Sequence, residues 1–359
     1  MRIVFYVSGH GYGHAVRDIE IIKSILKKEP RAEIHFRTGA PLWLFEPLLC
    51  ERVRFHHREL DFGVKQKNSF GANKKATFER YAELLQLKDK LLEEEIQFLH
   101  SLAPDVILSD ITPFAFDAAE AYGKKAVAVG NFSWDWIYSA FMDELPQFKF
   151  VVQDIKKSYS KAQRLFRIPF YGDMSAFANI ENVPLIGRRA KMPASEVRRR
   201  IGIPRNDGKK YVLLGLRMDD LKDVEFDQME TMNGLCFVAV SRDVNVPNCL
   251  HIKEGQPPFE ELLNACDAVL SKPGYSMVAE VIINHTPIVY VPRQDFVEDP
   301  PLIAGLQRYA VSERLSQDDY FAGNWHGAFQ RLFAKPGTRP YIQSNGADVI
   351  ADRILADAG

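Results

Sequence analysis

The sequence predicts an α/β protein with two domains, each built on an open, doubly wound parallel sheet. At 359 residues the chain is about twice as long as a common single domain. Short apolar runs alternate with segments of helical periodicity, which is typical of parallel strands joined by crossover helices. The alternation occurs twice, before and after a stretch rich in proline and glycine at residues 166–189, where we place the domain junction.

The first series begins at the N-terminus. We expect strands at residues 3–7, 33–37, 106–109 and 126–130. Apolar residues at three-to-four spacing predict helices at 19–28 and 77–99. The stretch 61–75 is basic, contains glycine and has no clear period, which predicts a mobile surface loop. Its lysines could meet an anionic acceptor or simply be solvated; they are Lys65, Lys67, Lys74 and Lys75.

The second series follows the junction. Its expected strands are 211–215, 236–240, 251–252, 268–270 and 288–291, and its expected helices are 258–266 and 276–283. A final helix is expected at 345–355. These elements predict a first domain of residues 1–170, joined by the C-terminal segment 343–359, and a second domain of residues 185–338.

The charge balance, the cysteines and the apolar runs of the chain argue against several classes of protein. The 46 basic and 47 acidic side chains leave a formal charge of -1, which argues against a nucleic-acid binder. The cysteines form no C-x-x-C pair, so we expect neither a zinc site nor a disulfide framework; they are Cys50, Cys236, Cys249 and Cys266. No apolar run approaches ~18 residues and no signal peptide precedes the first strand, so we expect a soluble, cytoplasmic protein without a membrane span.

Ligands of open parallel sheets bind at the carboxyl ends of strands, so the loops there are the candidate sites. The first loop reads SGHGYGHAVR, residues 8–17. Its glycines fall as G-x-G-x-G, which does not match a dinucleotide fingerprint. They include Gly11 and Gly13, which allow a ligand close to the backbone. His14, at the helix start, could accept a proton from a substrate hydroxyl, or His10 and His14 could both hydrogen-bond the turn.

Two further loops of the first half carry candidate residues. Asp110, in LSDITPFAFD, could orient a histidine of the first loop and stabilise its imidazolium, or it could cap the following helix. The sequence alone does not separate these roles. Trp134 and Trp136, in NFSWDWIY, could form an apolar wall for an acceptor or pack under the loop.

In the second half, the candidate residues follow three expected strands. Lys272, Pro273 and Gly274 could offer an ammonium and backbone amides to a diphosphate, and Arg217 could reach the same phosphates. Glu280 could accept both hydroxyls of a ribose or be an ordinary helix residue. The segment VPRQDFVED, where the chain leaves the strand expected at 288–291, adds charged side chains at the same edge of the sheet, namely Arg293, Asp295, Glu298 and Asp299.

The order of these residues resembles a known family. The run PPFEELLNACDAVLSKPGYSMVAEVIINHTPIVYVPR, followed by FVED, is similar to the donor-binding half of GT-B glycosyltransferases. SGHGYGHAVR resembles the Gly-His turn of inverting members, whose catalytic histidine then falls on His14, and LSD resembles the segment that supplies its aspartate partner. SGHGYGHAVR together with GNFSWDWIY resembles the glycosyltransferase-like N-terminal region of plant arabinokinases. The resemblance covers most of the chain and is patchy over residues 51–102.

This resemblance implies two Rossmann-like domains that face each other across a cleft. It further implies an inverting, metal-independent transferase that takes a UDP- or dTDP-sugar as donor substrate and needs no cofactor. His14 would be the base and Asp110 its partner. The implied donor-binding residues are Arg217, Lys272, Pro273, Gly274, Tyr275, Ser276, Glu280, Glu298 and Asp299. The implied acceptor or turn residues are His10, Gly11, Gly13, Arg17, Trp134 and Trp136.

Several positions depart from the family pattern, and two other functions stay open. Lys272 replaces a phosphate-binding histidine, Asp299 a common glutamine and His285 a usual glycine, which leaves the sugar undefined. A non-hydrolysing nucleotide-sugar epimerase would need more carboxylates at the sugar, for which Asp117, Asp295 and Glu298 are candidates. A non-catalytic nucleotide-sugar-binding module would need Gly274 and Glu280 but neither His14 nor Asp110. The sequence does not identify the acceptor.

Overall fold

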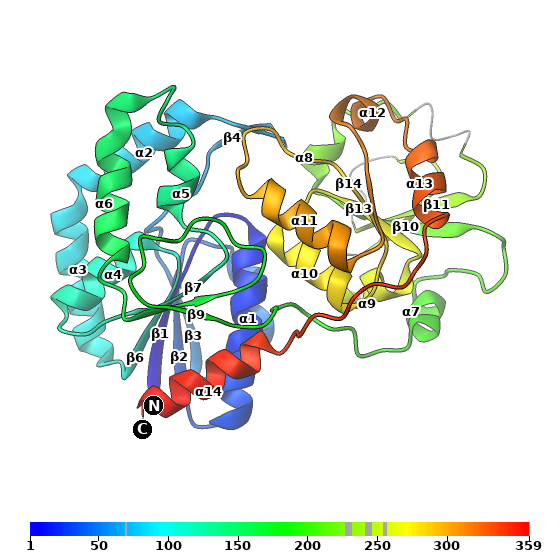
Figure 1. The fold of residues 1–359 in the computed structure, drawn as a ribbon. Coiled ribbons are helices and arrows are strands. Elements are labelled where there is room, and N and C mark those ends of the chain that lie inside the picture. Colours follow the sequence, from blue (N-terminus) through cyan, green and yellow to red (C-terminus); the bar gives the residue numbers. More distant parts are fainter. Residues whose placement is uncertain (69, 227–231, 241–245, 254–256, 359) are drawn as a thin grey trace.

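The computed structural model describes residues 1–68, 70–226, 232–240, 246–253 and 257–358. These residues form two parallel sheets that lie side by side, each flanked by helices (Figure 1). The predicted fold class of two doubly wound α/β units is therefore confirmed. Within the described part of the chain, no helix combines the length and the apolar character that a membrane crossing requires.

The first sheet has seven strands in the order β3-β2-β1-β6-β7-β8-β9, and all neighbours in it run parallel. Its strands are β1 (Arg2–Val7), β2 (Glu33–Thr38), β3 (Val53–His57), β6 (Val106–Asp110), β7 (Val127–Gly130), β8 (Arg164–Arg167) and β9 (Ile180–Asn182). The four predicted strands are β1, β2, β6 and β7, whose residues are almost all buried because helices cover both faces. The strands β3, β8 and β9 were not predicted, since they are short and carry several polar residues.

The helices of the first half differ from the prediction at two points. They are α1 (Tyr12–Lys28), α2 (Lys74–Gln86), α3 (Lys88–Leu102), α4 (Pro113–Ala121), α5 (Trp134–Ser139) and α6 (Lys149–Tyr159), with 3-10 turns at Leu42–Leu44, Glu46–Leu48 and Pro146–Phe148. The helix expected at 77–99 is two helices that meet at Leu87. Helix α1 begins at Tyr12, two residues before His14, where the helix start was expected, and seven residues before the periodic segment 19–28. Gly11, with a left-handed φ of 74°, occupies the position just before it.

The prediction of a mobile surface loop at residues 61–75 is wrong. The segment contains the antiparallel pair β4 (Gln66–Asn68) and β5 (Gly71–Ala72), and α2 starts at Lys74. Its apolar side chains explain the difference, since Phe70 is only 2% exposed and contacts Tyr320 and Phe321 of the second half. The backbone N–H of Gln294 also donates to the carbonyl of Phe70 at 2.9 Å. This segment therefore connects the two halves.

The second sheet has six parallel strands in the order β12-β11-β10-β13-β14-β15. They are β10 (Lys210–Gly215), β11 (Leu235–Val240), β12 (Cys249–Ile252), β13 (Ala268–Ser271), β14 (Ile288–Tyr290) and β15 (Ser312–Arg314). Its helices are α7 (Ala194–Arg200), α8 (Met218–Leu221), α9 (Phe259–Ala265), α10 (Tyr275–Ile283), α11 (Asp299–Tyr309), α12 (Gln317–Phe321) and α13 (His326–Phe333). All five predicted strands and both predicted helices are present, and β15 is an additional strand.

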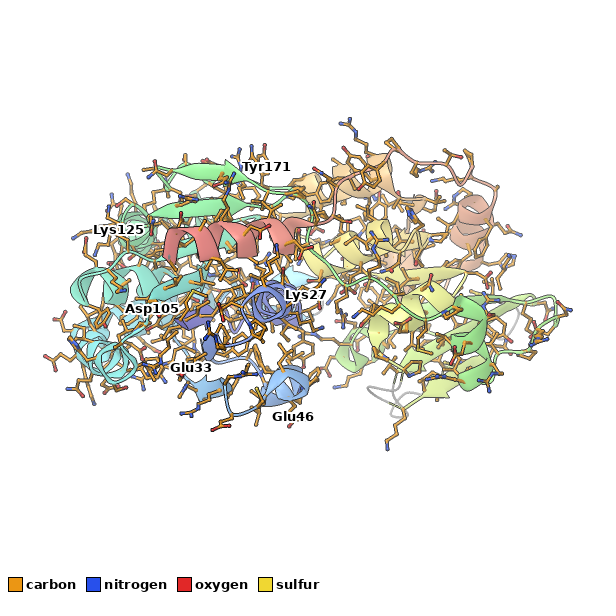
Figure 2. The ribbon with its side chains drawn as sticks, turned by 90° about the horizontal axis from the view of Figure 1, so that it is seen from below. Lys27, Glu33, Glu46, Asp105, Lys125 and Tyr171 are labelled. Atoms are coloured by element: carbon orange, nitrogen blue, oxygen red, sulfur yellow. The ribbon has the colours of Figure 1, made fainter. Side chains whose placement is uncertain are left out.

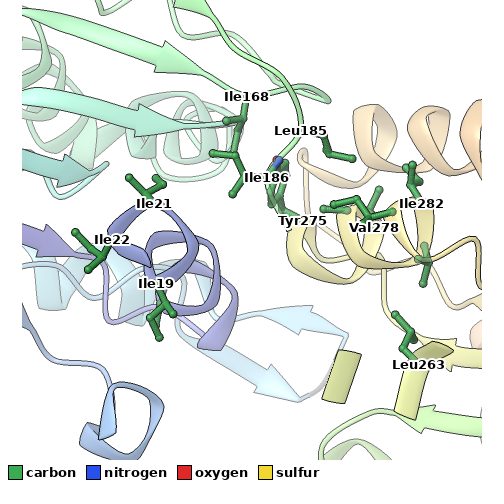
Figure 3. Packing of buried hydrophobic residues seen from close by; sticks show 14 of the residues in the cluster. Ile19, Ile21, Ile22, Ile168, Leu185, Ile186, Leu263, Tyr275, Val278 and Ile282 are labelled. Atoms are coloured by element: carbon green, nitrogen blue, oxygen red, sulfur yellow. The ribbon is translucent and has the colours of Figure 1, made fainter. Parts of the chain in front are cut away.

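The last helix, α14 (Gly346–Ala358), returns to the first half and packs along α1 (Figures 1 and 2). The hydroxyl of Ser24 donates to Asp348 at 2.5 Å, and Lys28 pairs with Asp352 at 2.5 Å. The apolar core is also continuous between the halves. Figure 3 shows Ile186 and Tyr275 lying between α1 and the rest of α10. This packing brings the loop after β1 against the start of α10.

Candidate active site between the two sheets

The candidate residues gather where the strand order of each sheet reverses. In the first sheet β1 lies beside β6, and the loops after these strands carry His14 and Asp110. In the second sheet β10 lies beside β13, and the residues that follow are Arg217 and Lys272. Adjacent loops diverge at such switch points, which is where open α/β sheets bind ligands.

His14 and Asp110 form a buried pair. The Nδ1 atom of His14 lies 2.6 Å from Oδ2 of Asp110, and their side chains are 8% and 0% exposed. The alternative role of Asp110 as a helix cap is wrong, because Thr112 occupies the cap position of α4 and both oxygens of Asp110 face His14 and Arg17. The alternative in which His14 only fixes its own turn is also wrong, since its Nδ1 lies in hydrogen-bond contact with Asp110 at the end of β6.

Arg17 completes this pair from the next turn of α1. Its Nη2 donates to Oδ1 of Asp110 and lies 3.0 Å from Nδ1 of His14, while its Nη1 donates to Oδ1 of Asn131 at 3.1 Å. Its guanidinium also lies 5.3 Å from the ring centre of Tyr275 on α10. Because Arg17 is only 2% exposed, its charge acts at short range on Asp110 with little screening by solvent.

The charges around Asp110 decide its protonation. Burial raises the pKa of this carboxyl, but the positive charge of Arg17, the interaction with His14 and the hydrogen bond from His14 outweigh burial and hold the pKa at about 2. Asp110 is then an ionised acceptor, so the short contact requires a proton on Nδ1 of His14. Nε2 of His14 is then the nitrogen of the neutral ring that can accept a proton.

Two buried carboxyls near His14 were missed by sequence reasoning. Asp61 accepts from the backbone N–H of Gly9 at 3.2 Å and from Nε1 of Trp134 at 3.3 Å, so it holds the turn after β1 in place. Asp18 lies one helical turn after His14 and is 0% exposed. The sequence did contain a signal for Asp18. It follows the candidate base by four residues, which places it on the same face of the helix.

His10 lies near His14 but is not part of the hydrogen-bonded pair of His14 and Asp110. Its ring contacts Trp134 edge-on with a centroid distance of 5.3 Å, and Gly63 lies so close to it that a Cβ there would stand 2.1 Å from the ring. Burial, followed by the charges of His14, Arg293 and Arg217, lowers the pKa of His10 to about 3. His10 is therefore neutral at physiological pH.

The two tryptophans of the first half occupy different places. Trp134 is 1% exposed and packs against His10, His14 and Phe132. Trp136 packs on Gly172, where a Cβ would stand 2.2 Å from its ring. The burial of Trp134 fits the alternative of packing under the loop, and a wall of both tryptophans against an acceptor stays a prediction.

On the side of the second sheet, the cations already have acidic or aromatic partners. Nζ of Lys272 donates to Asp220 at 2.9 Å, and burial lowers the pKa of this ammonium. The guanidinium of Arg217 lies 4.5 Å from the ring centre of Tyr12, across the gap between the halves. Asp220 also accepts from the backbone N–H of Arg217 at 2.9 Å. Asp220, which sequence reasoning missed, therefore organises both candidate phosphate-binding residues.

Glu280 is paired as well. Both of its oxygens accept from Arg188, at 2.6 and 3.1 Å, and the carboxylate is 1% exposed. Burial raises the pKa of Glu280, and Arg188 opposes that rise. A ribose would have to share this carboxylate with Arg188. The reading of Glu280 as an ordinary surface residue of a helix is wrong.

Glu298 and Asp299 are held by Arg293. The Nε atom of Arg293 donates to Asp299 at 2.7 Å, and its Nη2 lies 3.3 Å from Glu298. Glu298 also accepts from Nδ2 of Asn131 at 3.1 Å. The amide of Asn131 therefore joins Arg17, on the side of the first sheet, to Glu298, on the side of the second sheet.

Close backbone contacts fix the two halves at this point. The hydroxyl of Ser276 donates to the carbonyl of Gly13 at 2.8 Å, and a Cβ on Gly13 would lie 3.0 Å from the hydroxyl oxygen of Ser276. Tyr275 contacts Arg17 and accepts from the backbone N–H of Ile186 at 3.3 Å. Pro273 and Gly274 lie just before α10, and Gly274 occupies its cap position without a side-chain cap. A Cβ added to the turn glycine Gly11 would lie 3.8 Å from Nη2 of Arg217.

A separate cavity of about 680 Å³ lies beside the first sheet, between the segment 57–65 and helices α2 and α3. Lys65 lines it, together with the ion pair of Arg80 and Glu59. Lys74 instead pairs with Glu144 and Asp295 at 2.6 and 3.1 Å, and Lys75 pairs with Glu79. The side chain of Lys67 lies outside the described part of the structure. Of the three lysines whose side chains are described, two are therefore paired with acidic residues, and only Lys65 lines the cavity.

Neither a disulfide nor a cluster of metal-ligand side chains occurs within the described residues. The four cysteines are all free. Across the described ranges, no group of three or more histidine, cysteine, aspartate or glutamate side chains is arranged to hold a metal ion.

Comparison with known proteins agrees with the fold. No family model matches the chain. It is 31% identical over 356 residues to L-arabinokinase from Arabidopsis thaliana; the match covers 97% of this chain and 33% of that protein, so the chain spans about a third of its relative. Among solved structures, UGT89C1 from Arabidopsis thaliana complexed with UDP has a TM-score of 0.64, 16% identity and 99% coverage of both chains. The glycosyltransferase SnogD from Streptomyces nogalater has a TM-score of 0.61 and 15% identity, with 100% of this chain and 99% of that chain covered.

Proposed function

We propose that this chain, which has the fold of GT-B glycosyltransferases, is an inverting glycosyltransferase that moves a sugar from a nucleotide-diphosphate donor to an acceptor hydroxyl. The observation that carries the proposal is the buried pair of His14 and Asp110 at the switch point of the first sheet. With the domains divided as predicted, residues 1–170 and the C-terminal helix take the acceptor side and residues 185–338 the donor side.

In this mechanism Nε2 of His14 takes the proton of the acceptor hydroxyl while its oxygen attacks the anomeric carbon. The new C–O bond forms on the face opposite the nucleotide, the bond to the diphosphate oxygen breaks, and the configuration inverts. The imidazolium formed is stabilised by ionised Asp110, which lies at Nδ1. His14 is thus the catalytic base, and Arg17 and Asp110 orient it.

The donor would lie against the second sheet. Lys272, Arg217 and the amides at the start of α10 would neutralise charge on the departing diphosphate, so the proposal needs no metal. Glu280 would hold the ribose, and Glu298 with Asp299 would contact sugar hydroxyls. UGT89C1 has been solved with UDP and with UDP-L-rhamnose, which supports a UDP-sugar; a dTDP-sugar is the second candidate.

The two other functions have less support. An epimerase would recruit further carboxylates, but Asp117 is held by Lys88, Lys161 and Ser158, on another part of the first half. Asp295 is paired with Lys74. A non-catalytic module would not need the short contact between His14 and Asp110. The compact arrangement around His14 therefore favours the transferase.

The test combines donor binding with turnover. A panel of UDP- and dTDP-sugars is first screened by calorimetry, and nucleotide release is then followed for wild type, His14→Ala and the control His326→Ala, whose histidine is exposed on α13. We expect His14→Ala to bind donor like wild type and to lose about 10²- to 10⁴-fold in turnover, with no loss in the control. If no nucleotide sugar binds, the transferase and the binding module both fail. Proton exchange from the sugar without release of nucleotide would instead support the epimerase.

A further inference from the structure

Asp18 is a buried carboxyl that the proposed mechanism leaves without a role. It follows His14 by one turn of α1 and is 0% exposed. Within the described residues, neither of its oxygens receives a hydrogen bond. Its nearest cationic atom is Nε of Arg17, at 3.7 Å, which is too long for a hydrogen bond. A carboxylate in this position would be an acceptor without donors.

The neighbour of Asp18 is a second carboxyl, that of Asp110. The single guanidinium of Arg17 gives its Nη atoms to Asp110 and Asn131, and only its unbonded Nε faces Asp18. One cation cannot compensate two adjacent carboxylates that are shielded from water. One of the two must therefore carry a proton.

The surroundings decide which carboxyl carries it. Burial raises the pKa of Asp18 well above its usual range and the negative charge of Asp110 raises it further, whereas the pKa of Asp110 is about 2. The charged and titratable groups of this region are Arg17 and His14 on α1, Asp110 on β6, Asp61 after β3 and the hydroxyl of Tyr275 on α10. Of these, only Arg17 carries a permanent positive charge, and its hydrogen bond goes to Asp110.

We propose that Asp18 is a positioning residue for the catalytic pair: as a neutral carboxylic acid it donates a hydrogen bond to Asp110, which keeps its negative charge directed at His14 and Arg17. Asp110 then receives three hydrogen bonds on two oxygens, from His14, Arg17 and Asp18, within the capacity of a carboxylate. The inference deepens the proposed function, because it takes His14 as the base.

The experiment uses the free, full-length protein with carboxyl-¹³C aspartate and ¹⁵N histidine labels. At pH 7 we expect one aspartate signal with the chemical shift of a protonated carboxyl that disappears in Asp18→Asn and persists in the control Asp352→Asn, an exposed residue of α14. The amide of asparagine replaces the O–H donor, so the Nδ1–H signal of His14, assigned with His14→Gln, should stay in place in Asp18→Asn. In Asp18→Leu, which has no donor, we expect that signal to shift.

Two results would overturn the inference. One is an Asp18 signal that is already ionised at pH 7, in which case Asp18→Asn would also move the Nδ1–H signal by removing a charge. The other, readable on wild type alone if the variants do not fold, is the absence of any protonated aspartate at pH 7. The labelled protein is studied without substrate, so this inference and the proposed function can fail separately. An ionised Asp18 would overturn the inference but not the transferase proposal. A protein that shows no transferase activity would overturn the proposed function but not the hydrogen bond between Asp18 and Asp110.

Discussion

The two sides of the candidate site differ in how their charges are arranged. On the side of the first sheet, His14, Asp110 and Arg17 already stand in the geometry that proton transfer requires. On the side of the second sheet, the charges that would bind a donor are paired with each other, as Lys272 with Asp220, Glu280 with Arg188, and Asp299 with Arg293. In the proposed transferase the base would therefore be preorganised, whereas donor binding would have to compete with internal ion pairs.

The largest effect should come from Arg17, which holds the preorganised side together. Arg17→Met leaves Asp110 buried without its cation, and we expect the free energy of unfolding to fall by about 3–5 kcal/mol. Urea unfolding at pH 7 measures it. The matched control is Arg2→Met, which breaks a half-exposed pair with Glu33 and a hydrogen bond to the carbonyl of Leu102, and should cost much less. Equal losses in the two variants would show that the network around Asp110 is no stronger than a surface pair.

The next largest effect is a pH dependence of the free energy of unfolding that arises from His10. The folded protein keeps this ring neutral down to its pKa of about 3, whereas the unfolded chain takes up the proton below about pH 6.5. The unfolded state therefore binds more protons between these values, so stability contributed by His10 is complete above pH 6.5 and is lost as the pH falls. We expect wild type to lose about 2–3 kcal/mol more than His10→Asn between pH 7 and pH 4.5, measured by urea unfolding at both values. His35 and His56 are unchanged in the variant and cancel in the difference. Parallel losses in both proteins would contradict the burial of His10.

Asn131 tests the connection between the two sides. Asn131→Ala leaves Arg17 and Glu298 each without one hydrogen bond, and we expect the free energy of unfolding to fall by about 1–2 kcal/mol. Asn179→Ala removes an exposed hydrogen bond of the same sheet and serves as the control. An unchanged stability of Asn131→Ala would mean that the two sides are not linked through this amide.

The sequence predicted the central strands and the residues at their ends, because buried parallel strands are continuous apolar runs and their loops follow directly. It offered a contact between His14 and Asp110 as one of two possible roles of Asp110, and the structure has the two side chains 2.6 Å apart. It missed Asp18, Asp61 and Asp220, whose roles depend on which helix face or loop meets another element. It also misjudged the segment 61–75, since Phe70 is buried by contacts with residues some 250 positions later. Such long-range packing has no local period to detect.

The smallest predicted effect concerns Asp220. It is a gain in the affinity for UDP, whereas the changes above are losses of stability. Asp220→Asn retains a side-chain oxygen that can accept from the N–H of Arg217 but removes the negative charge that engages Lys272 at 2.9 Å. The ammonium of Lys272 then meets a diphosphate with less competition, so we expect UDP to bind roughly fivefold more tightly, or by about 1 kcal/mol, in calorimetry at low salt. Asp219→Asn changes an exposed neighbour that is paired with Lys222 and should leave the affinity unchanged. Weaker binding in Asp220→Asn would mean that Asp220 holds Lys272 in its binding position and does not compete with the diphosphate, in which case both sides of the site are preorganised.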